Sequence, residues 1–318
     1  MTNLMLSKKI YLLSIFHQMQ TLKFYNWQVA IAPELGGNLC RLCYNDSLEI
    51  LRTPKRAWCL DKKREFYGLP VLFPPNRISD GQFTIDGTQY TLPINEKKRH
   101  NHLHGLPLHD AWVASVSKNR IDMTWTYGAE HPAFTGFPCP CRIELTYEFD
   151  PTCVKQTVKI INTGDVELPC GFGFHSVFNT PKRAKITAAS WRWEMLPPRW
   201  LPSGTKLPWE AFNPTKWFCP ADYKISSFHT PIEEGTFDGK PFRGAILDYG
   251  KNVVLYEIDE NYRYWCLWNQ RPDSGFFCPE PMSWMIDAPN LPFPREVSGV
   301  RVLAPGEIAT YTTKISVH

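Results

Sequence analysis

The chain has 318 residues, 43% of them hydrophobic and 21% charged, and its net charge is +4. This balance is typical of a globular protein and argues against intrinsic disorder. Basic residues gather only in two triplets, at 62–64 and 97–99, which are too short for the positive stripe that binds nucleic acid. No apolar run approaches the roughly 18 residues that a membrane-spanning helix needs. We therefore expect neither nucleic acid nor a membrane as a partner.

Residues 1–20 are predicted to form an extension ahead of a single domain at 21–318. The apolar segment at 10–16 follows Lys8 and Lys9 and superficially resembles a signal peptide. It is short for that purpose, and no small-residue cleavage site follows it. We expect the extension to be loosely attached and the protein to be cytoplasmic.

The ten cysteines favour the same compartment. They are scattered from residue 40 to residue 278, so their spacing indicates no disulfide framework. Cys40 and Cys43 form a lone C-x-x-C with no second pair, which is weak evidence for zinc or redox chemistry. We expect buried, reduced thiols, which are typical of a reducing cytoplasm.

Alternating apolar residues predict antiparallel strands along most of the chain. An Asp-Gly pair at 86–87 predicts a hairpin over residues 83–92. Further strands are predicted at 142–149, 154–160, 254–258 and 262–268. The chain contains 28 prolines, which break most windows long enough for a helix. The predicted fold class is all-β, one large antiparallel sandwich or barrel.

Three histidines spaced two residues apart, His100, His102 and His104, form the first candidate site. If this segment is extended, the three imidazoles point to one side, a geometry that suits zinc. No further ligand motif accompanies them. Three interpretations therefore remain open: a metal site, solvated loop histidines, or contact of one or two of them with an organic substrate.

Two single residues are candidates for proton transfer. His175 lies in an apolar, glycine-flanked segment, where it is either a satisfied core residue or a group that titrates near neutrality beside a carboxylate. Glu280 lies between Pro279 and Pro281. It is either an exposed loop residue or a rigid, partly desolvated base, because desolvation raises the pKa of a carboxyl group.

Four motifs in chain order resemble signatures of the galactose mutarotase (aldose 1-epimerase) family. They are N-R-I-x-x-G-x-F at 76–83, N-x-L-H-G at 101–105, H-x-x-F-N at 175–179 and E-P at 280–281. Order and spacing agree from about residue 25 to residue 318. The resemblance implies a single large antiparallel β-supersandwich with a sugar cleft. It also implies an isomerase that interconverts the α and β anomers of a free aldohexose with no cofactor and no metal.

The resemblance also assigns roles to individual residues. Glu280 is the expected general base for the anomeric hydroxyl, and His175 the expected general acid for the ring oxygen. Substrate binding is expected from Arg77, His104 and Asn76. His102 is expected to be a local variation at the cleft rim, and His100 is expected to face solvent. The family's sugar-gripping aspartate corresponds to Asp238, in a segment that resembles Y-D-H-P-F, with Asp248 as the reserve.

This sequence departs from the family pattern at Leu106, where a second glycine is usual, and at Ser176 and Val177, where H-P-Y-F-N is usual. The sugar preference is therefore open. One alternative is a hexose-6-phosphate 1-epimerase, with a phosphate held by Arg56 or by the basic triplet at 97–99. Others are a non-catalytic carbohydrate-binding protein of this fold and a zinc hydrolase that uses the histidine run. We expect a small sugar as the partner, and a monomer or homodimer.

Overall fold

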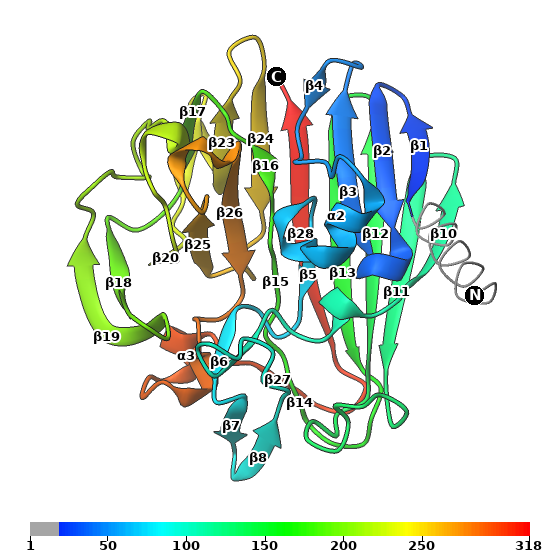
Figure 1. Ribbon diagram of the computed structural model, residues 1–318, viewed down its shortest axis with the longest axis vertical. Helices are drawn as coiled ribbons and strands as arrows, with labels where there is room; N and C mark the ends of the chain where they lie inside the picture. Colours follow the sequence, from blue (N-terminus) through cyan, green and yellow to red (C-terminus); the bar gives the residue numbers. More distant parts are fainter. Residues whose placement is uncertain (1–18) are drawn as a thin grey trace, which may run out of the picture.

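The computed structural model describes residues 19–318, and it is built almost entirely of strands (Figure 1). The first eighteen residues of the predicted extension at 1–20 lie outside the described residues, and the first strand begins at Gln20. The predicted all-β class is confirmed. Among residues 19–318, no helix is both long and apolar enough to cross a membrane.

Two large antiparallel sheets form the frame of the protein. Sheet I has the strand order β10 (Val113–Ser117), β11 (Arg120–Tyr127), β12 (Cys141–Asp150), β13 (Cys153–Asn162), β28 (Ile308–Val317), β24 (Val253–Ile258), β23 (Gly244–Asp248), β17 (Arg183–Ile186). Sheet II has the order β19 (Leu201–Pro208), β18 (Trp191–Leu196), β20 (Phe228–Pro231), β25 (Tyr264–Trp268), β26 (Phe276–Met282), β15 (Gly173–Phe174), β5 (Val71–Leu72), and β16 (Phe178–Asn179) pairs with β26 beside this path.

Smaller elements surround this frame. A four-stranded sheet contains β1 (Gln20–Phe24), β2 (Trp27–Ala32), β3 (Asn38–Tyr44) and β4 (Leu48–Glu49). The two-stranded pairs are β14 (Leu168–Pro169) with β27 (Val302–Leu303), β21 (Gly235–Phe237) with β22 (Lys240–Phe242), β6 (Arg77–Ser79) with β9 (Asn101–Leu103), and β7 (Gln82–Ile85) with β8 (Thr88–Thr91). The helices are short: α2 (Ala57–Lys62), α3 (Arg295–Ser298) and the 3-10 turns η1 (Pro33–Leu35), η2 (Arg64–Phe66), η3 (Pro107–His109), η4 (Pro220–Asp222), η5 (Pro272–Ser274) and η6 (Ala288–Asn290).

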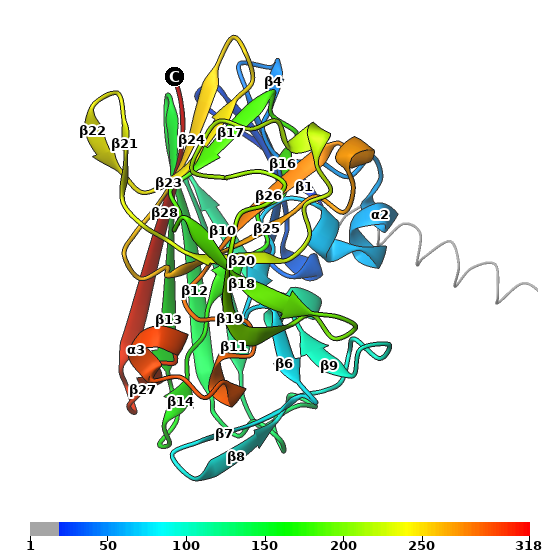
Figure 2. The same cartoon turned by 90° about the vertical axis from the view of Figure 1, so that its left-hand side faces the viewer.

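Strand alternation places the main core between sheet I and the two sheets that pack on it, sheet II and the four-stranded sheet (Figures 1 and 2). Phe24 of β1 stacks on Phe149 of β12 with ring centroids 4.4 Å apart. In β12 the predicted residues Ile143, Leu145 and Tyr147 are buried while their neighbours are partly exposed. Across the interface, the ring of Tyr256 in sheet I lies 6.4 Å from that of Trp265 in sheet II. The predicted Asp-Gly hairpin is also confirmed, because β7 and β8 pair across a turn with positive φ at both of its central residues.

Sheet II carries a second set of buried residues on the face that looks away from this core. Every residue of β26 is buried, but Phe277 belongs to the main core whereas Glu280, three residues on, points to the opposite face because side chains alternate along a strand. The register pairs Glu280 with Cys266 and Met282 with Gly173. His175, two residues after Gly173, is therefore level with Glu280 on the same face.

Candidate functional site

A cavity of about 350 Å³ lies over this face of sheet II. Five of the six residues that the motifs single out line it: Asn76, Arg77, His104, His175 and Glu280. They come from sheet II and from the β6–β9 pair, so the motifs meet in space although the first and last lie about 200 residues apart in the sequence. Concave sites with a few convergent polar groups are typical of small-molecule binding.

His175 and Glu280 form a buried pair at the bottom of the cavity. The His175 Nε2 atom lies 3.3 Å from Glu280 Oε1, and the side chains are only 4% and 2% exposed. The other atoms of the pair, His175 Nδ1 and Glu280 Oε2, are buried and have no hydrogen-bond partner among residues 19–318. Buried polar atoms in folded proteins are almost always paired. An unpaired polar atom on each residue is therefore unusual and marks this pair as a candidate functional site.

Burial controls the protonation of this pair. It raises the pKa of Glu280 well above its ordinary value, an effect that the charge of Arg77 partly offsets. Burial also lowers the pKa of His175 to about 3. Both shifts favour the uncharged form of the pair, in which Glu280 carries the proton and His175 is neutral. One proton shared by a carboxyl group and an imidazole at contact distance provides an acid and a base in the same site.

His104 and Asn76 are held in place by backbone geometry that few residue types adopt. Both have positive φ, at 65° for His104 and 58° for Asn76, and the His104 amide donates to the Asn76 carbonyl at 2.9 Å. The His104 ring packs edge-on against His175 with centroids 5.1 Å apart, and its Nδ1 has no partner among the described residues. Burial and the neighbouring His175 lower the pKa of His104, so its imidazole is neutral.

The glycine of the N-x-L-H-G motif is required by a close backbone approach. Gly105 has φ of 78°, and a Cβ atom there would lie 2.2 Å from the Phe73 carbonyl oxygen.

We expect Gly105→Ala to lower the free energy of unfolding by about 3 kcal/mol or more, through both backbone strain and collision with Phe73. Guanidinium denaturation measures this. Gly87→Ala is the matched control, because Gly87 also has positive φ (81°) but nothing within 4 Å, so about 1 kcal/mol is expected. If Gly105→Ala and Gly87→Ala lose equal free energy of unfolding, the close approach to Phe73 does not contribute.

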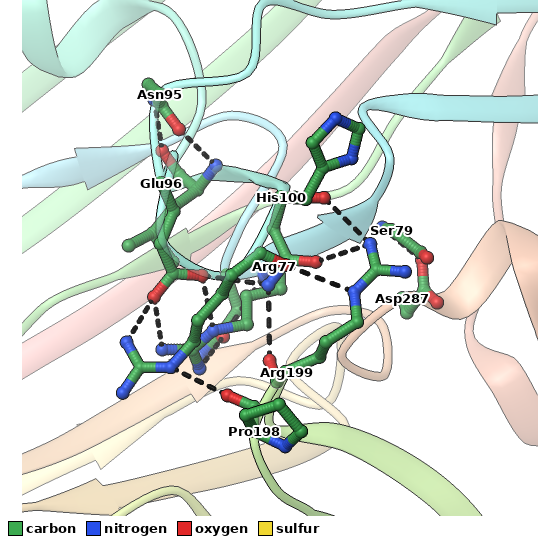
Figure 3. Close-up of polar contacts among 12 residues, drawn as sticks. Arg77, Ser79, Asn95, Glu96, His100, Pro198, Arg199 and Asp287 are labelled. Carbon is green, nitrogen blue, oxygen red and sulfur yellow. Dashed lines mark hydrogen bonds and ion pairs between the residues drawn. The ribbon is translucent and has the colours of Figure 1, made fainter.

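Arg77 is positioned by a glutamate that sequence reasoning missed. Glu96 accepts hydrogen bonds from Arg77 Nε at 2.9 Å and Nη2 at 3.1 Å, from Arg99 Nη1 at 2.7 Å and from Asn101 Nδ2 at 2.8 Å (Figure 3). Burial acts to raise the pKa of Glu96, but these bonds and the Arg77 charge outweigh it and lower the pKa. Both arginines and Glu96 line the cavity. No motif marks Glu96, which lies in an irregular polar segment.

The structure does not bring Asp238 to this cavity. Asp238 is exposed at the turn between β21 and β22, where Asp238 and Gly239 both have positive φ. An Asp-Gly pair with this geometry makes a two-residue hairpin turn, which leaves the aspartate in solvent. The reserve, Asp248, does not line the cavity either, and its carboxylate pairs with Arg183 at 2.7 Å.

Another carboxylate does reach the cavity. Glu65 lines the cavity from the short turn η2, which follows helix α2. Burial raises the pKa of its carboxyl group. A bond from its own backbone amide and the charge of Lys63 act in the opposite direction. Trp268 and Phe66 provide aromatic wall on the same cavity. The sequence contained no signal for Glu65, because no motif includes the segment at 57–66.

The three histidines of the 100–104 run diverge. Positive φ at His100 and His104 interrupts the extended segment, so the side chains do not share one side. His100 is exposed, as expected, and pairs with Asp80 at 2.8 Å. His102 is fully buried rather than at the cavity rim, because β9 aligns it with Ile78 on the inner face, and its Nδ1 bonds to the Pro93 carbonyl. Only His104 enters the cavity.

One group among residues 19–318 has donor atoms close enough to share a metal ion. It contains His175, Cys278 and Glu280, whose nitrogen, sulfur and oxygen atoms lie within 4.8 Å of one another. Two of these residues line the cavity, whereas Cys278 is buried behind it. The histidine run at 100–104 is not part of this group.

Comparison with known proteins finds similar sequences and structures for the chain as a whole. The sequence model of the family described as aldose 1-epimerase matches residues 19–316. The crystal structure of a galactose mutarotase-like protein from Clostridium acetobutylicum superposes with a TM-score of 0.85, at 29% identity and 94% coverage of both chains. The Escherichia coli protein YihR is 31% identical over 108 residues, 33% of this chain and 34% of that protein. Rat galactose mutarotase is 25% identical over 177 residues, 55% of this chain and 48% of that enzyme. The alignments thus span about a third and about half of these two relatives.

Proposed function

Because the chain belongs to the aldose 1-epimerase family, we propose that it is an isomerase that interconverts the α and β anomers of a free aldohexose. The observation that carries this proposal is the buried His175–Glu280 pair, with one unpartnered atom on each residue, in a cavity of sugar size. The ten free cysteines fit the cytoplasmic location that we also propose.

The pair provides the two proton transfers that anomerisation needs. When the shared proton moves across the 3.3 Å contact to His175, Glu280 becomes the base and His175 the acid. Glu280 takes the proton of the anomeric hydroxyl, His175 gives its proton to the ring oxygen, and the C1–O5 bond breaks to leave an aldehyde. Rotation about C1–C2 and the reverse transfers then close the ring on the other face.

Burial favours the intermediate of this reaction. After ring opening Glu280 is protonated and His175 is neutral, which is the uncharged form that desolvation stabilises. Arg77 and His104 line the same cavity and would bond to the sugar oxygens as charge develops on them. We assign the grip on the remaining hydroxyls to Glu65, since Asp238 lies outside the cavity.

Polarimetry tests the proposal. Freshly dissolved α-glucose and α-galactose should reach their equilibrium rotation faster with the protein than without it. Acceleration with glucose 6-phosphate but with neither free sugar would favour the phosphorylated alternative. Binding of a sugar without acceleration of any aldose would favour a carbohydrate-binding protein, and the enzyme proposal would then be wrong.

Replacing Glu65 by Gln is expected to raise KM for the preferred aldose about tenfold with little change in kcat, since hydrogen bonds to a charged acceptor contribute about 1.5–3 kcal/mol. Initial rates over a range of sugar concentrations measure this. Asp61→Asn is the matched control, because Asp61 lies on the neighbouring helix α2, is 42% exposed and does not line the cavity. An unchanged KM in Glu65→Gln would show that Glu65 does not contact the sugar.

The catalysed rate is expected to stay level from neutral pH down to about pH 4. Burial lowers the pKa of His175 to about 3, so the His175–Glu280 pair gains a second proton only near that pH. Burial raises the pKa of Glu280, so the pair loses its one proton only at a pH above that raised value. The measurement is kcat/KM from pH 4 to pH 9 after subtraction of the spontaneous rate. Loss of activity near pH 6.5, the ordinary histidine value, would contradict this expectation.

A further inference from the structure

The His175–Glu280 pair has a third donor atom beside it, the sulfur of Cys278. One nitrogen of His175, one oxygen of Glu280 and this sulfur all lie within 4.8 Å of one another. Cys278 and Glu280 are two residues apart on β26, so their side chains point to the same face of sheet II. All three residues are buried. Together they form a set of metal ligands, of which the proposed proton transfers use only two members.

The spacing of the three donor atoms suits zinc. In tetrahedral sites zinc binds imidazole nitrogen, thiolate sulfur and carboxylate oxygen at about 2.0–2.3 Å, so neighbouring donor atoms lie roughly 3.3–3.7 Å apart. His175 Nε2 and Glu280 Oε1 are 3.3 Å apart, and shifts of about 1 Å bring the sulfur of Cys278 to the same spacing. His175 and Glu280 also line the cavity, which gives an ion a path to the three ligands.

The charges of the ligands suit an ion at a buried position. A thiolate from Cys278 and a carboxylate from Glu280 balance the two positive charges of Zn²⁺, and the imidazole of His175 binds as a neutral ligand. The complex is therefore uncharged, which avoids the large cost of burying an isolated charge. On binding, the thiol of Cys278 and the His175–Glu280 pair each release one proton to solvent. His175 Nδ1 and Glu280 Oε2 have no hydrogen-bond partner among residues 19–318, so coordination at these atoms breaks no hydrogen bond.

A metal ion at this position is incompatible with the proposed reaction. The ion occupies the lone pairs of His175 and Glu280, so neither residue can take a proton from the sugar. The sulfur of Cys278 favours a thiophilic metal such as zinc over magnesium, which prefers six oxygen ligands.

We propose that His175, Cys278 and Glu280 form a zinc site at the bottom of the cavity and that Zn²⁺ bound there inhibits the protein. The inhibition rests on the proposed function, whereas the binding of the metal does not. Because the ion and the sugar need the same two residues, the inhibition is competitive with the sugar.

Polarimetry with added Zn²⁺ tests the inhibition. We expect Zn²⁺ to abolish the acceleration of anomerisation and a chelator to restore it. A higher sugar concentration should raise the zinc concentration that halves the rate, and Mg²⁺ at the same concentrations should leave the rate unchanged.

Cys278→Ser should raise the zinc concentration that halves its own rate about tenfold or more, because loss even of a residue that only supports a metal ligand costs about 10–100-fold in affinity. Cys266→Ser is the matched control. Cys266 lies opposite Glu280 in the register of β25 and β26 and lines the cavity, but it is not part of the ligand group. Its variant should be as sensitive to zinc as the wild type. Cys278→Ala repeats the test without a buried hydroxyl group, and circular dichroism establishes that each variant is folded.

Cobalt reports the binding of a metal without any measurement of activity, because Co²⁺ in a tetrahedral site with a thiolate ligand absorbs visible and near-ultraviolet light. The wild type should acquire this absorption, Zn²⁺ should displace it, and Cys278→Ser should lose its thiolate band. An absorption spectrum that Cys278→Ser leaves unchanged, or equal zinc sensitivity of Cys278→Ser and the wild type, would rule out the zinc site. If the wild type binds cobalt in this way but accelerates no aldose, the zinc site stands and the proposed function fails.

Discussion

Glu280→Gln is expected to lower kcat for anomerisation about 10³-fold and to leave KM nearly unchanged, within the range that loss of a general base produces. The amide keeps the shape of the side chain in β26 but cannot take the proton of the anomeric hydroxyl. It also interrupts the shared proton between Glu280 and His175, which lie 3.3 Å apart. Polarimetry with the preferred aldose measures the loss, and more than a tenth of wild-type activity would show that Glu280 is not the base.

The same substitution separates catalysis from folding. Burial of Glu280 penalises its charged form and raises its pKa, so a neutral amide removes no favourable charge from the site. We therefore expect the melting temperature of Glu280→Gln to equal or exceed that of the wild type. A variant that loses both activity and stability would indicate that Glu280 supports the structure of β26. Glu65→Gln supplies the contrast, since its expected effect is on KM rather than on kcat.

The elements that could be predicted from the sequence are those whose signals are local. The alternation at Ile143, Leu145 and Tyr147 fixes which face of β12 is buried, and the Asp-Gly pair at 86–87 determines a hairpin turn. Gly105 and His104 lie in the N-x-L-H-G motif, and both have positive φ at a point where the backbone approaches Phe73 closely. Such requirements are visible in a short stretch of sequence.

The parts of the site that could not be predicted depend on contacts between distant segments. Glu96 matters because Arg77, nineteen residues earlier, folds onto it, and nothing near Glu96 in the sequence indicates that partner. Glu65 enters the cavity from η2, and Trp200 enters from the turn between β18 and β19. Asp238 lies outside the cavity for the opposite reason, because a local signal dominates there: the Asp-Gly pair at 238–239 encodes an exposed hairpin turn although the segment around it resembles the family's.

Glu96→Ala is expected to lower the free energy of unfolding by about 3–5 kcal/mol, the usual cost of leaving a buried charge without its partner. The Arg77 and Glu96 side chains are 11% and 10% exposed, and the turn before Trp200 is anchored through the same network. Guanidinium denaturation measures the change. Glu144→Gln is the control, because its pair with Arg142 is 38–43% exposed, and such pairs contribute less than about 1 kcal/mol.

Acid titration distinguishes the charge of Glu96 from its packing. The pKa of Glu96 is lowered in the folded protein because the Arg77 bonds and charge, with Asn101 and Arg99, outweigh burial. Its contribution to stability is therefore present above the ordinary glutamate value of about 4.3 and is lost as the pH falls through the lowered pKa. We expect Glu96→Gln to be less stable than the wild type at pH 7 and the difference to shrink below about pH 4. If the difference in free energy of unfolding between the wild type and Glu96→Gln stays constant down to pH 3, Glu96 stabilises the fold through the packing of its side chain and not through its charge. In that case the position of Arg77 in the wall of the cavity would depend on packing alone.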